Sequence, residues 1–472
     1  MTAAMRSMLF SLLDERAEMV EHRTQTATDL KSFANAVIAR ADELRDAGIG
    51  GAAVVACRKP LDYLRDIFAL WEAGTMAVTV NPAITPEERR NVVAATTASA
   101  LLDDDGLNKT GAKVHAAGPL GPDDPALVLM TSGTTGKPKG IVHTQRSLSA
   151  RISLNLSAIG ASDLQRSLCV LPLHFGHGMI GNVFTVLAAG GRLVLWPQPG
   201  LDEISGFGPL VDAERLTFMS STPTFWTVAM RLSPRPARAM RRVHVGSAPL
   251  SLPQWRAIAE WTGCSRVFNM YGMTETANWF AAASLEEADA ADGLVGHPWG
   301  GAAAVLCGDD EVRREGAGEI LAASPSMMSG YLGMEEETSA AFHGAWLRTG
   351  DTGRIDPAGR ITLVGRIKNE INRGGVKIPA EEIDMLLERH PQVREACAFA
   401  IPDPVAGEAV AAAVVGEDGL DIPALRAWCR ERCRAEAVPT RLFVMTAIPR
   451  NDRGKIVRAK VREAALASGP GA

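Results

Sequence analysis

The sequence lacks an excess of basic residues. Its 472 residues include 49 Lys and Arg against 54 Asp and Glu, which gives a formal net charge of −5. Without a basic excess, the chain lacks the electrostatic attraction that drives sequence-independent binding to nucleic acid, so a nucleic-acid-binding protein is excluded. The 46% of hydrophobic and 22% of charged residues are typical of globular proteins and exclude disorder as the main state.

Cysteines are also few. The seven cysteines include no C-x-x-C pair, and an odd number does not suit a framework of disulfides. Cys429 and Cys433 stand four residues apart and would share a helix face, but no His or further Cys stands near them to complete a zinc site. Neither a disulfide framework nor a structural metal site is expected.

Long apolar runs are absent as well. The run at 8–13 is interrupted by Asp14 and Glu15 and is shorter than the core of a signal peptide. The stretch 180–196 is broken by Gly190, Gly191 and Arg192 and falls short of a membrane span, so we expect a buried helix followed by a strand. These features predict a cytoplasmic protein without a membrane span.

Helices and strands alternate along the first half of the chain. Apolar residues recur at helical spacing over 29–44 and 61–73, and each run ends at glycine before a short apolar strand, at 52–56 and 77–80. Further strands are expected near 127–130, 168–171, 193–195, 218–220 and 242–245. This alternation predicts an α/β fold with a large wound domain and a largely parallel sheet.

The pattern changes near Gly296. Shorter β-like segments with Gly-containing turns follow, such as 360–364, and predict a β-rich subdomain. Beyond Gly365 the pattern predicts a compact α+β unit, with helices at 380–388 and 422–435 and strands at 395–400 and 442–445. We expect an N-terminal domain over 1–365, whose β-rich subdomain covers about 296–365, and a small C-terminal domain over 366–472.

The strongest local signal for chemistry lies at 127–140, where an apolar strand runs into a loop rich in hydroxyls and glycines. Glycines let backbone N–H groups approach an anion, hydroxyls donate further hydrogen bonds, and lysine adds positive charge. The loop does not fit the pattern of P-loop NTPases, because Gly133 and Gly136 lie too close together and Pro138 follows the first lysine. The residues of the expected phosphate cradle are Thr131, Ser132, Gly133, Thr134, Thr135 and Lys139.

Further motifs follow in order. They lie at 246–250, 269–275, 318–320, 330–333, 346–351, 365–375 and 449–456. Together with the loop at 127–140, they resemble the motifs of the adenylate-forming superfamily, which includes acyl-CoA synthetases, the adenylation domains of peptide synthetases and luciferases. The resemblance is to the AMP-dependent acyl-CoA synthetase type.

The resemblance implies an ATP site built from these motifs. Tyr271 would stack on adenine, with core packing as the alternative, and Asn269 would bond the adenine amino group. Glu275 is the ligand implied for Mg²⁺, and Thr274 would bond the α-phosphate. The other residues implied at the ATP site are Gly246, Ser247, Ala248, Pro249, Met270 and Gly272, with Asp351 and Arg366 on the ribose.

The resemblance also implies two active conformations. In the first, Lys455 would bridge the substrate carboxylate and the α-phosphate of ATP while the acyl-adenylate forms. The C-terminal domain would then turn about a hinge at Lys368 to present its opposite face for thioester formation. In that state Arg373, Gly374 and Gly375 would line the tunnel of the thiol's pantetheine arm. The small α+β C-terminal domain is therefore expected to be mobile.

The motif at 171–178 departs from the family and bears on the substrate. Peptide-synthetase domains usually carry an Asp near it, and its absence here disfavours an α-amino acid. Many acyl-CoA synthetases place a gating His where this chain has Phe175; we assign that role to His174, with a core histidine as the alternative. Gln145 replaces the family's His after the phosphate loop. The residues expected to line an apolar acyl pocket are Phe175, Met179, Phe225, Trp226, Met273 and Trp279.

The predicted function is ATP- and Mg²⁺-dependent activation of a carboxylic acid to an acyl-adenylate, followed by transfer to a thiol. CoA is the favoured thiol, because a hinge lysine followed by the run at 373–383 is found mostly in CoA ligases. The phosphopantetheine of an acyl carrier protein is the alternative, since it presents the same chemical arm. A non-catalytic adenylate-binding protein is more remote, because Lys455, Glu275 and Lys139 are all present. Two tryptophans in the acyl pocket favour a short or aromatic acid over a long fatty chain.

Overall fold

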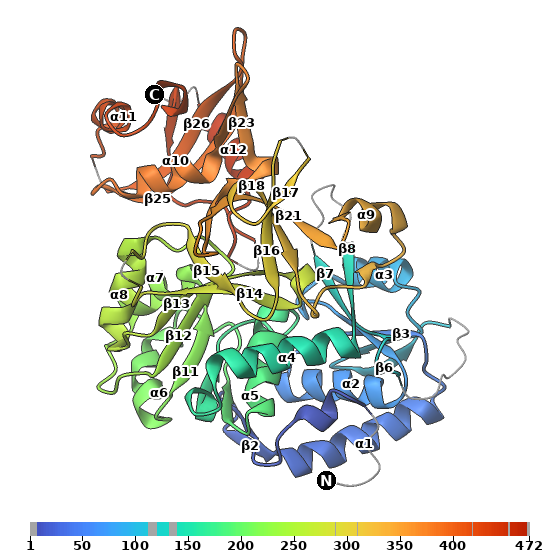
Figure 1. Ribbon diagram of the computed structural model, residues 1–472. Helices are drawn as coiled ribbons and strands as arrows, with labels where there is room; N and C mark the ends of the chain where they lie inside the picture. The colour runs from blue at the N-terminus through green and yellow to red at the C-terminus, as the bar shows by residue number, and fades with distance from the viewer. Residues whose placement is uncertain are drawn as a thin grey trace.

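The computed structural model describes residues 7–111, 120–131, 139–287, 289–308, 310–417, 419–451 and 454–469. Within these ranges the strands form three sheets. Figure 1 shows two of them in the larger lower body, and the third in a smaller domain above it at the orange and red end of the chain. The predicted α/β fold, with a large N-terminal part and a small C-terminal domain, is confirmed. In the part of the chain described here, no helix is both long and apolar enough to span a membrane.

The N-terminal sheet is parallel at its centre, where β3 pairs with β4 and β5, and β4 pairs with β7. Its strands, in spatial order, are β19 (Gly330–Tyr331), β8 (Lys139–Thr144), β7 (Pro125–Thr131), β4 (Met76–Thr79), β3 (Ala52–Val55), β5 (Ala100–Asp103) and β6 (Gly106–Lys109). Helices α1 (Leu30–Asp46), α2 (Pro60–Glu72), α3 (Pro86–Ala95) and α4 (Gln145–Ile159) belong to the same half of the chain. The helices and strands predicted between 29 and 80 are thus confirmed.

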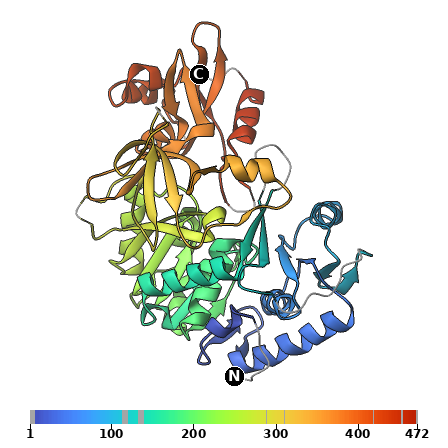
Figure 2. The same cartoon turned by 45° about the vertical axis from the view of Figure 1, so that its right-hand side comes forward.

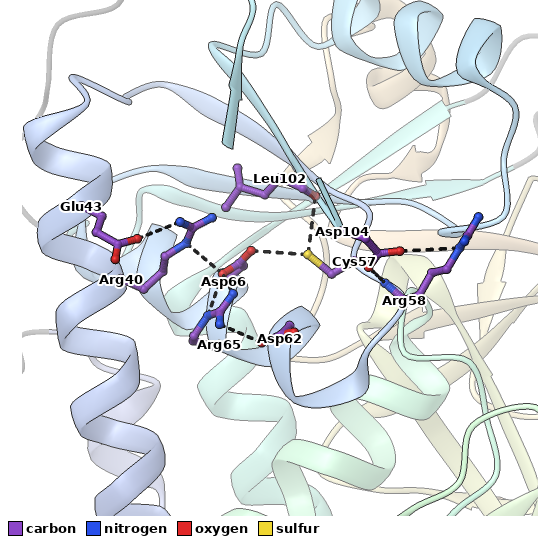
Figure 3. A network of polar contacts seen from close by, with 9 residues as sticks. All are labelled: Arg40, Glu43, Cys57, Arg58, Asp62, Arg65, Asp66, Leu102 and Asp104. Atoms are coloured by element: carbon purple, nitrogen blue, oxygen red, sulfur yellow. Dashed lines mark hydrogen bonds and ion pairs between the residues drawn. The ribbon is translucent and has the colours of Figure 1, made fainter. Parts of the chain in front are cut away.

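A buried ionic network ties α1 and α2 to the sheet (Figure 3). The Asp66 side chain is 1% exposed and accepts from Arg40 Nε at 3.1 Å and Arg65 Nη2 at 2.8 Å. The Cys57 thiol lies 3.4 Å from the same carboxylate, and burial raises the pKa of this thiol. The network holds a buried carboxylate through two guanidinium partners, so it fixes the helices without leaving an unpaired charge.

The second sheet is wound around parallel strands in its first half. Strands β1, β10, β9, β11, β12 and β13 pair in parallel. They are β1 (Glu18–Glu21), β10 (Arg192–Leu195), β9 (Arg166–Cys169), β11 (Phe218–Ser221), β12 (Arg242–Gly246) and β13 (Val267–Met273), with β2 (Thr26–Asp29) antiparallel at the edge. Helices α5 (Thr185–Ala188), α6 (Phe207–Ala213), α7 (Pro223–Leu232) and α8 (Leu252–Thr262) fall between these strands, together with the π-helix η3 (His177–Phe184).

After β13 the pairing becomes antiparallel, so the sheet expected to be largely parallel is parallel only in part. The β-rich segment continues this sheet through β14 (Asn278–Ser284), β15 (Leu294–Pro298), β22 (Ile361–Arg366), β21 (Trp346–Ile355), β18 (Gly316–Ala323), β16 (Ala302–Leu306) and β17 (Val312–Arg313). The short strand β20 (Phe342–His343) pairs with β21, and helix α9 (Glu335–Ala340) precedes it. Short hairpin connections allow this antiparallel order.

The C-terminal domain packs helices on a third, mixed sheet. Its strands are β23 (Glu370–Arg373), β24 (Val376–Pro379), β25 (Val393–Asp403), β26 (Gly407–Gly416) and β27 (Arg441–Val444). Its helices are α10 (Ala380–Glu388), α11 (Ile422–Arg430) and α12 (Arg458–Ala467). The helix expected over 422–435 is shorter, since a turn and the 3₁₀ segment Ala435–Ala437 follow α11. β22 ends at Arg366, and the 3₁₀ segment η6 (Ile367–Asn369) leads into β23; the domain boundary at 365–366 stays a prediction.

Polar contacts away from the connecting segment also join the C-terminal domain to the body, and Figure 2 shows the domain seated above it. Arg389, at the end of α10, forms an ion pair with Asp292 in the loop between β14 and β15, with Nε 3.0 Å from Oδ2. Arg450 lies 3.5 Å from the Thr224 hydroxyl on α7. Both contacts are broken if the domain moves away from this position.

We expect Arg389→Ala to loosen the seating of the C-terminal domain, because it removes the ion pair with Asp292. Since the Arg389 side chain is 55% exposed, the effect is modest, roughly a two- to fivefold faster tryptic cleavage after Lys368. The measurement is the rate at which fragments 1–368 and 369–472 appear by mass spectrometry. Arg432→Ala, which removes an exposed ion pair with Glu431 inside the domain, is the control; equal rates in the two variants would contradict the expectation.

Candidate functional site

The carboxylate of Asp351 is clamped between two of the residues expected around the nucleotide. The Tyr271 hydroxyl donates to its Oδ2 at 2.7 Å, and Arg366 Nε lies 2.6 Å from its Oδ1. Burial, together with the Asp351 charge, raises the pKa of Tyr271 well above its usual value. Burial opposes the charge on Arg366, but the Asp351 carboxylate outweighs it and raises the pKa of the guanidinium. The structure thus brings together one residue from each of three motifs.

A second cluster surrounds Glu275. The Tyr331 hydroxyl donates to Glu275 Oε1 at 3.1 Å, and Lys139 Nζ lies 4.8 Å from the centre of the Tyr331 ring. Burial and the Glu275 charge raise the pKa of Tyr331. Glu275 therefore stands beside the lysine that ends the expected phosphate cradle. Tyr331 belongs to a motif whose residues were given no role from sequence.

The turn that carries Thr274 and Glu275 is held from outside the motif. His143, at the end of β8, is fully buried and bonds the Thr274 carbonyl through Nε2 at 2.8 Å. Burial lowers the pKa of His143 to about 4, so the ring is neutral at pH 7. The Ser326 hydroxyl donates to the Thr276 carbonyl at 3.0 Å and in turn accepts from the buried Arg151. Sequence reasoning missed these positioning residues, since they meet the motif only through space.

His177, rather than His174, lies at the centre of the histidine motif. Its Nδ1 lies 2.7 Å from the Ser247 hydroxyl, and its Nε2 lies 2.7 Å from the Ser220 hydroxyl. Burial, reinforced by the positive charge of Lys455, lowers the pKa of His177 to about 3. His174 is 5% exposed, and its ring lies 4.0 Å from that of Phe175. His177 could have been found as the second histidine of the segment 171–178.

The loop that carries Lys455 is seated on the N-terminus of α7. Arg450 donates to the Gly454 carbonyl at 2.9 Å and pairs with Glu395 at 2.7 Å. A Cβ at Gly454 would lie 3.6 Å from the Thr224 hydroxyl, so the loop runs close to α7. The charge of Lys455 contributes to the lowered pKa of His177, so the loop lies within electrostatic reach of that ring.

Outside the expected phosphate cradle, the remaining expected ATP-site residues lie on β13 and at or just after the end of β12. Asn269 donates to the Leu294 carbonyl at 2.8 Å, and Met270 is 4% exposed. A Cβ at Gly272 would come within 2.1 Å of the Asn278 carbonyl, which explains why this position is glycine. Gly246 is buried, Ser247 and Ala248 are half-buried, and Pro249 is exposed. Ser132, Gly133, Thr134 and Thr135 lie outside the described residues, as does the side chain of Thr131 at the end of β7.

The hinge and thiol residues lie apart from Lys455. Lys368 stands in η6, where desolvation and the neighbouring Arg366 charge lower the pKa of its ammonium. Arg373, Gly374 and Gly375 form the turn between β23 and β24, in the hairpin region that rises at the top of Figure 1. Gly374 and Gly375 have φ of 61° and 89°, and nothing lies within 4 Å of a Cβ at Gly375. The two faces of the C-terminal domain thus carry different groups of expected residues.

The residues expected at the acyl pocket divide into two groups. Phe225 and Trp226 join an aromatic cluster with Phe207, and the Trp226 indole donates to Ser221 at 2.7 Å. The ring of Trp279 lies 5.6 Å from that of His177. Met179 is fully buried in η3, Met273 is half-buried at the end of β13, and Phe175 lies beside His174.

The chain is similar to known proteins both in sequence and in fold. The family profile described as "AMP-binding enzyme" matches residues 13–332, and that described as "AMP-binding enzyme C-terminal domain" matches 382–455. An oxalate–CoA ligase from Arabidopsis thaliana is 33% identical over 353 residues, 72% of this chain and 68% of its own. A sulfoacetate–CoA ligase from Cupriavidus necator is 36% identical over 359 residues, 73% of this chain and 69% of its own. ATP-bound MatB from Rhodopseudomonas palustris has a TM-score of 0.86 at 25% identity, covering 98% of this chain and 99% of its own.

The half-buried, neutral His177 predicts acid lability. Its native pKa of about 3 lies below the ordinary value of 6.5, so as pH falls below 6.5 the unfolded chain takes up a proton that the native state does not. Stability is therefore lost as the pH falls, by about 2 kcal/mol at pH 5 from this one group. In His177→Gln we expect the loss of unfolding free energy between pH 7 and pH 5 to be smaller by that amount, as measured by urea denaturation. The control is His343→Gln, at a side chain 33% exposed; the same loss in wild type and His177→Gln would contradict the expectation.

Proposed function

Because the chain belongs to the AMP-binding enzyme family, we propose that it is an AMP-forming acid–CoA ligase. The enzyme would convert a carboxylic acid, ATP and CoA to acyl-CoA, AMP and pyrophosphate. The observation that carries the proposal is the seating of the Lys455 loop on the N-terminus of α7, where Arg450 lies 3.5 Å from the Thr224 hydroxyl. The relatives named as oxalate–CoA and sulfoacetate–CoA ligases support CoA as the thiol. ATP and CoA are found together in the cytoplasm, which supports a cytoplasmic location.

In the proposed first step, a carboxylate oxygen of the acid attacks the α-phosphorus of ATP and the bond to the β-phosphate breaks, releasing pyrophosphate. Lys455 and Thr274 would hold the oxygens on which charge builds up. Asp351 and Arg366 would hold the ribose, and Tyr271 would face the adenine. Glu275 suits Mg²⁺, because its carboxylate is half-buried, keeps an oxygen not used by Tyr331, and lies beside the phosphate cradle. The metal would neutralise charge on the leaving phosphates.

In the proposed second step, the CoA thiolate attacks the acyl carbon and AMP leaves with the bonding electrons. The present arrangement supports the first step, since the loop of Lys455 is seated on α7, whereas Arg373, Gly374 and Gly375 lie in the turn between β23 and β24. Rotation of the domain 366–472 about Lys368 would exchange the two faces. The open space at Gly375 supports passage of a narrow pantetheine arm close to the backbone.

The experiment that tests the function is acid-dependent release of AMP and pyrophosphate over a panel of short acids, with and without CoA. We expect saturable use of free CoA, because cationic side chains such as Arg373 and Lys377 lie beside the turn that would receive it. Pantetheine and a phosphopantetheinylated carrier protein are the matched thiols. If pantetheine serves as well as CoA, or only the carrier protein serves, CoA is the wrong acceptor. If no acid releases pyrophosphate, the function itself is wrong.

Two variants separate the half-reactions. Lys455→Ala should abolish adenylate formation, by roughly 10²-fold or more, while thioester formation from supplied acyl-adenylate stays largely intact, because the lysine serves only the first conformation. Lys368→Pro should do the reverse, since proline fixes φ at the hinge. Both half-reactions are measured in each variant, and Lys460→Ala on the exposed side of α12 is the control. Equal loss of both half-reactions in Lys455→Ala would contradict the role assigned to this lysine.

A further inference from the structure

Three buried N–H donors without a hydrogen-bond acceptor lie together behind His177. They belong to Asn278, Trp279 and His244, whose side chains are 6%, 2% and 0% exposed. Asn278 Nδ2, Trp279 Nε1 and His244 Nδ1 have no hydrogen-bond partner among the described residues. A buried donor left unpaired is destabilising, so three such groups in neighbouring residues call for a cause.

The His244 ring presents an N–H rather than a lone pair at this place. Arg242 Nε donates to His244 Nε2 at 2.7 Å, and a guanidinium can only donate. Nε2 is therefore the acceptor of the ring. Burial and the neighbouring Arg242 charge lower the pKa of His244 well below its usual value, so the ring is neutral and its single proton lies on Nδ1. All three orphaned groups are then donors.

The other two donors belong to the first two residues of β14, and both side chains lie against η3. Ala277 and Asn278 have φ of 62° and 148°, which are unusual for residues with a Cβ. A Cβ at Gly181 would lie 1.7 Å from Asn278 Nδ2, so the amide rests directly on η3. The Trp279 ring lies 5.6 Å from that of His177 and 4.7 Å from that of His244. The Trp279 ring therefore contacts the rings of both His177 and His244.

Positive charge stands behind the donors. Arg242 is 3% exposed, its guanidinium lies 3.9 Å from the centre of the Phe268 ring, and its nearest recorded carboxylate, that of Asp163, is 3.9 Å away. That carboxylate lies closer to Arg266, at 2.9 Å. The charge of Arg242 is thus only partly neutralised, and it polarises the His244 N–H toward an acceptor.

We propose that Asn278, Trp279 and His244 bind the second acidic group of a short substrate acid, a carboxylate or sulfonate carried one or a few atoms from the carboxylate that is activated. The inference rests on the proposed function and names the substrate class of the same site. Several acceptor oxygens on one group would satisfy several donors at once. Trp279 then serves through its N–H, in addition to the apolar face expected from sequence.

The test compares acids with hydrocarbon isosteres of the same shape. Malonate is paired with isovalerate, and sulfoacetate with 3,3-dimethylbutyrate, in the pyrophosphate-release assay with CoA. A site that bonds a polar group rejects an analogue lacking it, so we expect kcat/KM to favour the acidic member of at least one pair by about 10²-fold or more. Equal use of both members of each pair would show that the donors hold only structural water and would overturn the inference, with the ligase function intact. If none of the acids is activated, the proposed function fails first.

Variants assign the effect to the donors. Trp279→Phe keeps the ring and removes the N–H, so we expect kcat/KM for the preferred acid to fall roughly tenfold or more, mainly through KM, with less than about a threefold change for its isostere. Trp255→Phe is the control, because it removes an indole N–H that already donates to Val267; it should affect both acids alike. Melting temperatures establish that each variant folds. Equal loss for the acid and its isostere in Trp279→Phe would contradict the inference.

Discussion

The rest of the arrangement depends on the contacts of the buried Asp351 carboxylate with Arg366 and Tyr271. Asp351 and Arg366 are register partners on β21 and β22, so sheet pairing sets their ion pair, and the Tyr271 hydroxyl reaches the same carboxylate from β13. Arg366 is also the last residue of β22 before η6, and its backbone N–H donates to Glu381 on α10. The clamp thus fixes the end of β22, in the second sheet, at the point where the connection to the C-terminal domain begins. A rotation about 367–369 can break the contact with α10 while the clamp stays in place.

Neutral buried histidines set the electrostatics around this clamp. His143 and His244 are fully buried and His177 is half-buried, and desolvation lowers the pKa of all three. Fixed charge is left to Lys455, Arg366 and the carboxylates they face. Charges in such a site act at low effective dielectric, where they interact more strongly than in water. The same desolvation lowers the free energy of unfolding at acidic pH, because the unfolded chain takes up protons on these histidines that the native state does not.

The sequence predicted those residues of the candidate site that lie within contiguous motifs. Tyr271, Asp351 and Arg366 were assigned to the nucleotide from three separate segments, and the structure brings them together. What sequence could not supply was the contact made through space. His143 meets the Thr274 carbonyl because β8 ends beside the turn, and Tyr331 meets Glu275 because β19 pairs with β8. The site roles themselves remain proposals. The wound fold was predictable from alternating helices and strands, whereas the change to antiparallel pairing at β13 was not, since local periodicity does not specify a strand's neighbours.

The contacts of His177 depend on a backbone conformation that the sequence does not reveal, and the gating role of His174 stays a prediction. A π-helix begins at His177. The His177 ring lies within hydrogen-bond distance of Ser220 at the end of β11 and of Ser247 after β12. Sequence spacing does not reveal that helix type. Beyond His177, the path inward meets Trp279 and then His244, with the aromatic rings of Phe218 and Phe268 packed against the latter. Arg242 and these two aromatic rings fill the space next to His244. The proposed acid is therefore short because its second acidic group would occupy the place that the tail of a long acyl chain needs.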